Sequence, residues 1–200
     1  MNTKFDGAGI AIAVADRDRP IPLGQAARMP SLLGSTAKRL VDIVCGILGL
    51  AVIAIAGAVL WAANPIWNPG PLFFCQTRMG KDCKPFTAIK FRTMREAHGP
   101  TRGPDDPLEH DRITALGRLL RRTRLDEMPQ VINILRGEMS LIGPRPDYWP
   151  HAVAYVERVP GYRERHRVKP GITGLAQVSL GYAEGVEATF RKVRYDLAYL

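Results

Sequence analysis

The stretch RLLRRTRLDEMPQ, residues 118–130, places four arginines within seven positions and then two adjacent carboxylates, Asp126 and Glu127. A patch of surface ion pairs would explain this spacing, although each exposed pair contributes under about 1 kcal/mol to stability. The alternative is an anion-binding site with an acidic group inside it. Four arginines are more than two carboxylates need as partners, and the pattern therefore favours the anion site.

The two carboxylates are also expected at the start of a helix. Thr123 stands three residues before Asp126, as the first residue of a capping box does, and Pro129 is tolerated only in the first turn of a helix. Backbone N–H groups and the helix dipole favour negative charge at such a place. Nearby arginines stabilise the ionised form of a carboxylate, which suits a nucleophile or a metal ligand.

A further arginine lies in the rigid sequence GPRP. Pro144 and Pro146 restrict the backbone on both sides of Arg145, so its guanidinium group is expected to be held in place. Planar, bidentate binding of phosphate is a property of arginine that lysine lacks. Arg145 is therefore a second candidate for binding an anion.

Lysines and arginines in two other motifs extend this set. Lys90 and Arg92 belong to KFRTM, and Lys169 begins KPGITG. Together these cations predict a site for a diphosphate. A nucleotide diphosphate would normally bring Mg²⁺, and Asp126 or Glu127 is then its natural ligand.

A second acidic group lies in the loop 96–111, which is broken by proline and glycine. Its spacing fits no standard metal-binding loop, and it is the weaker candidate for a metal site. Its members are Asp105, Asp106, Glu109 and Asp111.

Composition limits the class of protein. The 200 residues are enough for one compact domain, and the net charge of +9 suggests an anionic partner: nucleic acid, an acidic membrane surface or a phosphorylated substrate. The three cysteines lack any C-x-x-C spacing, which argues against a disulfide framework.

A long apolar segment decides between these classes. The residues IVCGILGLAVIAIAGAVLWAA, 43–63, contain no charge, and as a helix they would be roughly 30 Å long, the thickness of a bilayer's hydrocarbon core. Basic residues flank the segment on both sides, and they favour the cytoplasmic face. A spanning helix would export one basic flank, whereas a re-entrant one would keep both inside. The residues alone leave both topologies open.

The expected organisation is α+β. A mobile N-terminal arm, 1–34, precedes a membrane-embedded helix, 35–65, and a small, mainly helical catalytic domain, 66–200, on the cytoplasmic side. Within the domain, residues 70–80 and 84–94 predict a short β-hairpin, and residues 148–159 predict a helix. The amphipathic stretch 184–200 predicts a last helix that lies on the membrane surface or packs on the core.

Four blocks, KRLVDIVCGI, KFRTM, LDEMPQVINILRGEMSLIGPRP and KPGITGLAQV, resemble in order and spacing the bacterial sugar transferase family, the monotopic phosphoglycosyl transferases. The resemblance covers residues 36–200. It implies an enzyme of the bacterial inner membrane that starts exopolysaccharide or glycoconjugate synthesis. Such an enzyme transfers a sugar-1-phosphate from a UDP-sugar to undecaprenyl phosphate with Mg²⁺.

Carried over by residue, the resemblance makes Asp126 the nucleophile and a Mg²⁺ ligand, with Glu127 as its metal-linked or acid/base partner. It associates Arg92, Arg121 and Arg145 with phosphate or substrate binding. The family also favours the re-entrant topology, although the Ser-Pro break common in relatives is replaced by residues 54–57, Ala-Ile-Ala-Gly. The Asn-Gly-Arg stretch that many relatives have after GLAQV is replaced by residues 179–182, so the sugar is not predicted.

Two readings from other classes compete with the enzyme. A membrane-tethered nucleic-acid-binding protein would use the basic patches, but it would need interleaved aromatic residues or a recognition helix, and neither is evident. A scaffold that recruits other enzymes would use the arm or the last helix. We therefore expect the lipid bilayer, a UDP-sugar and undecaprenyl phosphate as partners, and no nucleic acid. The oligomeric state stays open, and a homo-oligomer is one of its possibilities.

Overall fold

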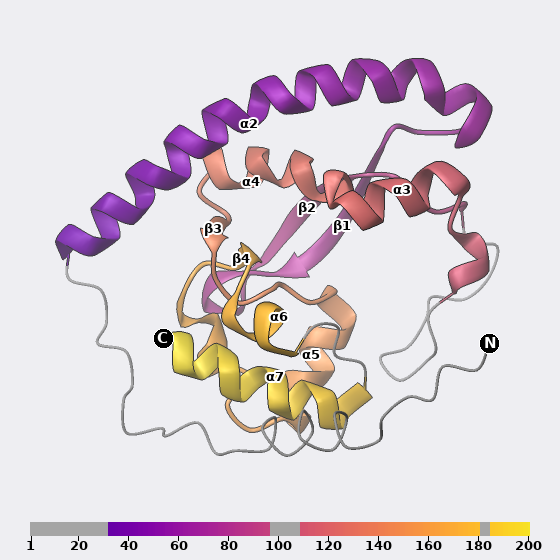
Figure 1. Cartoon of the computed structure of the whole chain (residues 1–200). Helices are drawn as coiled ribbons and strands as arrows, with labels where there is room; N and C mark the ends of the chain where they lie inside the picture. Colours follow the sequence, from indigo (N-terminus) through magenta and orange to yellow (C-terminus); the bar gives the residue numbers. More distant parts are fainter. Residues whose placement is uncertain (1–31, 97–108, 181–184) are drawn as a thin grey trace, which may run out of the picture.

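A computed structural model describes residues 32–96, 109–180 and 185–200 of the chain (Figure 1). The expected arm, 1–34, lies outside the described residues except for its last three, which already belong to a helix. In the acidic loop, Asp105 and Asp106 also lie outside them.

The described residues form helices, two pairs of short strands and four 3₁₀ segments. The α-helices are α2 (Leu32–Trp67), α3 (Ala115–Thr123), α4 (Val131–Leu135), α5 (Trp149–Arg158), α6 (Leu175–Leu180) and α7 (Gly185–Tyr199). The strands are β1 (Phe73–Met79), β2 (Pro85–Phe91), β3 (Ser140–Ile142) and β4 (Gly171–Thr173). The 3₁₀ segments are η2 (Lys81–Cys83), η3 (His110–Arg112), η4 (Leu125–Gln130) and η5 (Glu164–Arg167).

This architecture confirms the expected mainly helical domain with one short antiparallel hairpin. The hairpin pairs Phe73 with Phe91 and Met79 with Pro85. The sequence did not predict the second pair of strands, in which β3 and β4 run parallel and Ser140 is paired with Gly171. The predicted helix at 148–159 is α5.

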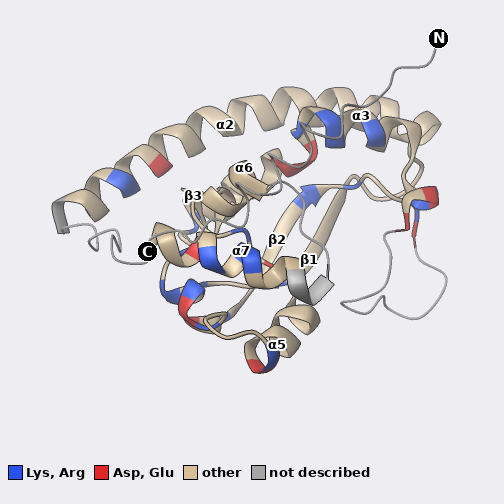
Figure 2. Ribbon diagram, turned by 60° about the horizontal axis from the view of Figure 1, so that its bottom comes forward, with Lys and Arg blue, Asp and Glu red and all other residues tan. Residues whose placement is uncertain are grey.

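The apolar segment lies within α2, a single uninterrupted helix of 36 residues that arches over the rest of the chain (Figure 1). By length and composition it could cross a membrane. Its charged residues are confined to its N-terminal part, and the remainder carries none (Figure 2). These features indicate membrane association, and whether the helix enters and leaves by the same face stays a prediction.

One narrow stripe of α2 is buried against the domain. Its buried positions recur at intervals of three, four or seven residues, which places them on one face of a helix. They are Asp42, Gly46, Gly49, Ile53, Leu60 and Asn64. We call these six residues the α2 seam.

Glycine lets the α2 seam approach α4 closely. A Cβ added to Gly46 would lie 2.7 Å from the side chain of Leu135, and one added to Gly49 would lie 2.9 Å from that of Val131. The rest of α2 exposes large apolar side chains, among them Leu48, which is 65% exposed. One face of α2 thus packs closely against the domain, and the other exposes apolar side chains that lipid can surround.

Polar contacts fasten both ends of α2. Near its start, Asp42 accepts a hydrogen bond from the backbone N–H of Leu141 at 2.9 Å, and Arg39 donates to the carbonyl of Leu135 at 3.0 Å. Near its end, the Asn64 amide donates to the carbonyl of Gly70 at 2.5 Å. Helix and domain therefore form one packed unit.

Helix α7 packs on the core of the domain. Val193 is 2% exposed and belongs to an apolar cluster with Tyr155, Val159 and Tyr162, against which Leu197 also packs. Of the two placements expected for this stretch, core packing is the one observed.

Candidate active site

The site is assembled from three parts of the chain. Lys90 is the last residue but one of β2, Asp126 and Glu127 lie in the first turn of η4, and Arg145 lies between β3 and α5. The 3₁₀ segment η4 lies against β2, so carboxylates and lysine face each other although they are far apart in sequence.

Asn133 fixes the register between these elements. Its side chain is fully buried, accepts from the backbone N–H of Ile89 at 3.2 Å and donates to the carbonyl of Thr87 at 2.7 Å. An amide side chain thereby bonds the edge of β2 as a neighbouring strand would. Lys90 follows immediately and is held opposite Glu127.

Glu127 lies between two cations. Lys90 donates to its Oε1 at 2.8 Å, and Arg145 donates to Oε2 at 2.9 Å and also to Oε1. Burial alone would raise the pKa of this carboxyl, but the hydrogen bond from Arg145 and the charge of Lys90 outweigh burial and hold the pKa far below its ordinary value. Glu127 is therefore a fixed anion.

The same arrangement lowers the pKa of Lys90. Burial and the charges of Arg78 and Arg145 lower its pKa to about 8, against the opposing effect of Glu127. The Lys90 side chain is 15% exposed, and its ammonium group lies in a markedly basic environment.

Asp126 differs from its neighbour. Its side chain is 8% exposed, and its Oδ1 is buried without a hydrogen-bond partner among the described residues. Burial raises its pKa, and the opposing charges of Lys90, Arg121 and Arg145 do not cancel that effect. We expected the arginines to stabilise the ionised form of Asp126; their charges do act in that direction, but burial outweighs them and the net shift of the pKa is upwards.

The junction before the carboxylates corrects the expected capping box. Thr123 is the last residue of α3, and its hydroxyl donates back to the carbonyls of Leu119 at 2.9 Å and Leu120 at 3.1 Å. Arg124 then adopts a left-handed conformation, with φ of 60°, and η4 begins with no side-chain cap. A sharp reversal separates the arginine helix from the carboxylates.

That reversal also separates the four arginines of residues 118–124. Arg118, Arg122 and Arg124 are exposed, as the solvated surface reading predicts. Arg121 alone turns inward, where its Nε donates to the Thr93 hydroxyl at 3.0 Å and its charge acts on Asp126.

Two predicted phosphate ligands have other surroundings. Arg92 donates to the carbonyls of Pro71 at 2.7 Å, Met94 at 3.3 Å and Asn68, so it holds the turn that follows α2. A phosphate contact by Arg92 stays a prediction and would compete with these bonds.

Lys169 lies away from the carboxylates. Its Nζ would be 3.5 Å from a Cβ on Gly137, just past the C-terminal end of α4. The charges that act on its pKa are those of Arg39, Asp42, Lys81 and Lys38, and neither Asp126 nor Glu127 is among them. The structure does not bring Lys169 together with Lys90 and Arg145.

The fit to Mg²⁺ depends on Asp126. Among the described residues, no group of three or more His, Cys, Asp and Glu side chains could hold a metal, and Glu109 of the acidic loop is paired with Arg112. The unpartnered oxygen of Asp126 can accept a cation, whereas both oxygens of Glu127 are bonded. Mg²⁺ is commonly bound by one or two carboxylates together with substrate phosphates, which this arrangement fits.

Comparison with known proteins places this site in a family. The family model described as bacterial sugar transferase matches residues 33–200. The chain belongs to the bacterial sugar transferase family. It is accordingly a transferase, and the four sequence blocks that suggested the family all lie within the matched region.

Three relatives show which named enzymes the chain is similar to. A UDP-glucose:undecaprenyl-phosphate glucose-1-phosphate transferase of Caulobacter vibrioides is 37% identical over 92% of this chain and 73% of its own length. One of the same name from Escherichia coli K12 is 41% identical over 82% of this chain. A UDP-N-acetylgalactosamine-undecaprenyl-phosphate N-acetylgalactosaminephosphotransferase of Aeromonas hydrophila is 37% identical over 86% of it.

The matched region is only part of some of these proteins. It covers 36% of the Escherichia coli relative and 41% of the Aeromonas one. The two names also differ in the sugar. Membership of the family therefore leaves the transferred sugar open.

Proposed function

We propose that this chain transfers a sugar-1-phosphate from a UDP-sugar to undecaprenyl phosphate, and so starts exopolysaccharide or glycoconjugate assembly at the cytoplasmic face of the bacterial inner membrane. What supports the reaction is one contrast within the site: Asp126 has a buried oxygen with no partner in the described ranges, directly beside a carboxylate that is held by Lys90 and Arg145. Similarity to relatives with such names supports the substrate classes.

In the proposed first step, a carboxylate oxygen of Asp126 attacks the phosphorus that bears the sugar. A bond forms between oxygen and phosphorus, the bond to the bridging oxygen breaks, and UMP leaves with the electron pair. In the second step, an oxygen of undecaprenyl phosphate attacks the same phosphorus and releases the carboxylate of Asp126. The sum is a polyprenyl diphosphate sugar and a regenerated enzyme.

The other residues favour this chemistry through charge. Arg145 and Lys90 lie beside Asp126 and bring positive charge to the place where the anionic diphosphate must approach an anionic nucleophile. Glu127 orients both cations. Mg²⁺, held by Asp126 together with the diphosphate, would supply further neutralisation of charge on the phosphate oxygens.

The long helix supports the second substrate class. An apolar helix packed against α4, the element that directly follows η4 with its two carboxylates, keeps the site close to a bilayer, from which a polyprenyl phosphate must be drawn. We further propose that α2 is re-entrant, because both of its flanks are basic.

The reaction is tested with donor alone. The full chain in detergent is incubated with Mg²⁺ and a UDP-sugar that is radiolabelled in the sugar-bearing phosphate. We expect label on the peptide that contains Asp126, release of one equivalent of UMP, and loss of the label to hydroxylamine, which cleaves acyl phosphates. Turnover with undecaprenyl phosphate but no labelled peptide would point to direct transfer and would overturn the covalent step.

A further inference from the structure

The loop that carries Arg145 is anchored through its carbonyl groups. Each carbonyl from Pro144 to Asp147 accepts a hydrogen bond from elsewhere in the chain. The donors are the backbone N–H of Gly171 to Pro144 at 3.0 Å, Arg165 to Arg145 at 2.7 Å, Arg78 to Pro146 at 2.6 Å and the backbone N–H of Met79 to Asp147 at 3.1 Å.

The sequence explains why this loop is anchored through its carbonyl oxygens. Pro144 and Pro146 have no backbone N–H, so two of the donors that could tie down this loop are missing. Restricted backbone angles limit the loop's shape but do not set its place relative to Glu127. External donors to the carbonyls can do that, and at Arg145 itself the donor is a guanidinium group.

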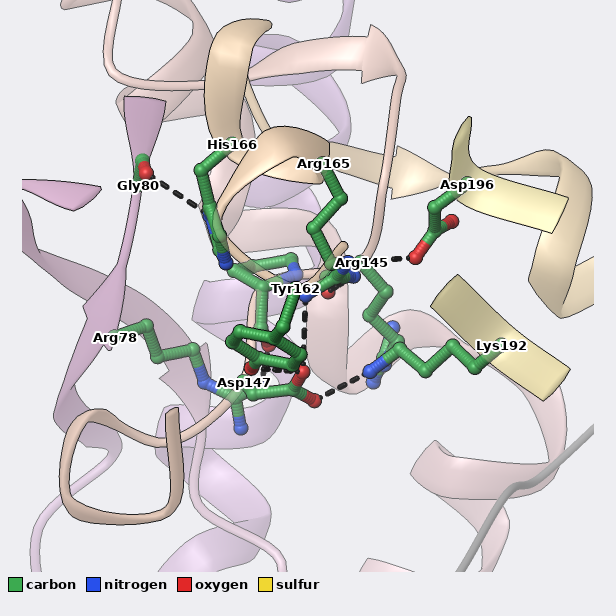
Figure 3. Close-up of polar contacts among 10 residues, drawn as sticks. Arg78, Gly80, Arg145, Asp147, Tyr162, Arg165, His166, Lys192 and Asp196 are labelled. Atoms are coloured by element: carbon green, nitrogen blue, oxygen red, sulfur yellow. Dashed lines mark hydrogen bonds and ion pairs between the residues drawn. The ribbon is translucent and has the colours of Figure 1, made fainter. Parts of the chain in front are cut away.

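Arg165 is buried completely and binds three parts of the chain. It lies in η5, and its Nε donates to Asp196 of α7 at 2.7 Å, its Nη1 to Asp147 at 3.0 Å, and its Nη2 to the carbonyl of Arg145 (Figure 3). Its guanidinium carbon also lies 5.1 Å from the centre of the Tyr162 ring.

The charges around Arg165 balance locally. Asp147 accepts from Lys192 of α7 at 2.5 Å and from the hydroxyl of Tyr162 at 2.7 Å. Two cations, Arg165 and Lys192, thus face two anions, Asp147 and Asp196. A buried ion network of this kind is seldom more stabilising than packed apolar side chains, and its value lies in the geometry that it enforces.

We propose that Arg165, held by Asp196, is a positioning residue that sets the place of Arg145 in the active site. Helix α7 is then part of the catalytic unit, although no described contact joins one of its residues to Asp126 or Glu127. The inference rests on the proposed function, in which Arg145 acts on the donor diphosphate.

The test compares Arg165→Lys with the wild-type chain. A lysine carries its three N–H donors on one nitrogen, so it cannot reproduce the planar fork in which Nε, Nη1 and Nη2 of Arg165 each bond a different acceptor. We expect kcat/KM for the UDP-sugar to fall roughly ten- to a hundredfold, in line with the effect of small misplacements of binding groups. The KM for undecaprenyl phosphate should stay within about twofold, since the network acts through Arg145.

A double-variant cycle separates positioning from a general loss of structure. If Arg165 acts through Arg145, adding Arg165→Lys to Arg145→Met should cost less than about twofold further. Additive losses would overturn the proposal. Val193→Ala is the matched control, because it removes apolar packing from the same helix and leaves the ion pairs of Arg165 in place. An equal fall in donor kcat/KM at an equal loss of Tm in this control would also overturn the proposal.

A milder variant covers the case in which Arg165→Lys does not fold. Asp196→Asn keeps the shape of the partner of Arg165 and removes its charge, and a selective fall in donor kcat/KM is again expected. Failure of the two proposals can be told apart: a wild-type chain that releases no UMP from any UDP-sugar refutes the function, whereas normal turnover with an unaffected Arg165→Lys refutes only the positioning.

Discussion

Asp126 and Glu127 are adjacent in the chain but have opposite electrostatic environments. Burial raises the pKa of Asp126, whereas Arg145 and Lys90 hold that of Glu127 far below its ordinary value. Successive residues of a tight helix point in different directions, so Glu127 faces the two cations while Asp126 keeps an oxygen that bonds nothing in the described part of the chain. The pair therefore combines one fixed anion, Glu127, with one carboxylate whose protonated form is favoured by burial.

Asp126→Asn should abolish turnover while the protein stays folded. An amide of the same shape cannot attack phosphorus, and loss of the nucleophile is expected to reduce UMP release at least about a thousandfold. Burial disfavours the charged form, so the neutral amide should not lower the Tm. UMP release and thermal unfolding in detergent measure the two effects. Substantial remaining turnover would refute the assignment of the nucleophile.

Glu127→Gln should damage stability as well as activity. The change leaves Lys90 and Arg145, which are 15% and 17% exposed, without their shared anion. Breaking a buried pair from one side costs about 3–5 kcal/mol. The Tm of the single variant should therefore fall, and adding Lys90→Met should restore part of it. A double variant as unstable as the sum of both single variants would show that the two residues are not coupled.

Helix α2 should tolerate a large residue at a glycine outside the α2 seam but not at a glycine within it. Gly49 lies against Val131, whereas a Cβ on Gly57 would meet nothing within 4 Å. Gly49→Leu should thus lower the Tm by several degrees and increase proteolysis of the domain, because overpacking costs about 1–3 kcal/mol. Gly57→Leu is the matched control on the same helix and should change neither. Equal effects of the two variants would mean that α2 does not dock as described.

The stability of the chain should fall between neutral and mildly acidic pH because of His166. Its Nδ1 donates to the carbonyl of Gly80, and its Nε2 is buried with no partner among the residues that the structure describes. Burial and the charge of Arg165 lower its pKa to about 3. The unfolded chain takes up a proton at the ordinary pKa of 6.5. The contribution of His166 is therefore complete above pH 6.5 and is lost as the pH falls towards 3.

Thermal unfolding at pH 7 and pH 5 tests this directly. The linkage predicts a loss of about 2 kcal/mol between these two pH values. His166→Asn retains a donor for Gly80 and cannot take up the proton, so its Tm should change less over the same interval. A wild-type Tm with no more dependence on pH than that of the variant would contradict the prediction.

The sequence predicted those features that depend on neighbouring residues. The hairpin follows from two β-rich runs joined by a glycine turn, and α5 follows from its helical periodicity. The acidic pair and Arg145 were identified because their residue types and local spacing already suggest their chemistry. The capping box at Thr123 was wrong, since a left-handed residue at Arg124 ends the helix there and no local pattern announced it.

Features that depend on distant contacts could not be predicted from the residues alone. The strands β3 and β4 are three residues each, too short for a periodic signal, and pair only because residues 140 and 171 meet in the fold. Asn133 has no special neighbours in the sequence, and its role appears only when α4 lies along β2. Arg165 lies in a run of basic residues that resembles solvated surface, yet it is fully buried.

The bond between Asp42 and Leu141 joins residues that are 99 positions apart. A ribosome that adds about 5–20 residues per second needs roughly 5 to 20 s to cover that distance. If α2 enters the bilayer as it is made, it waits there with its carboxylate and its glycine face unpaired. The helix is then already in the membrane when the domain is synthesised, and the domain folds against its exposed carboxylate and glycine face.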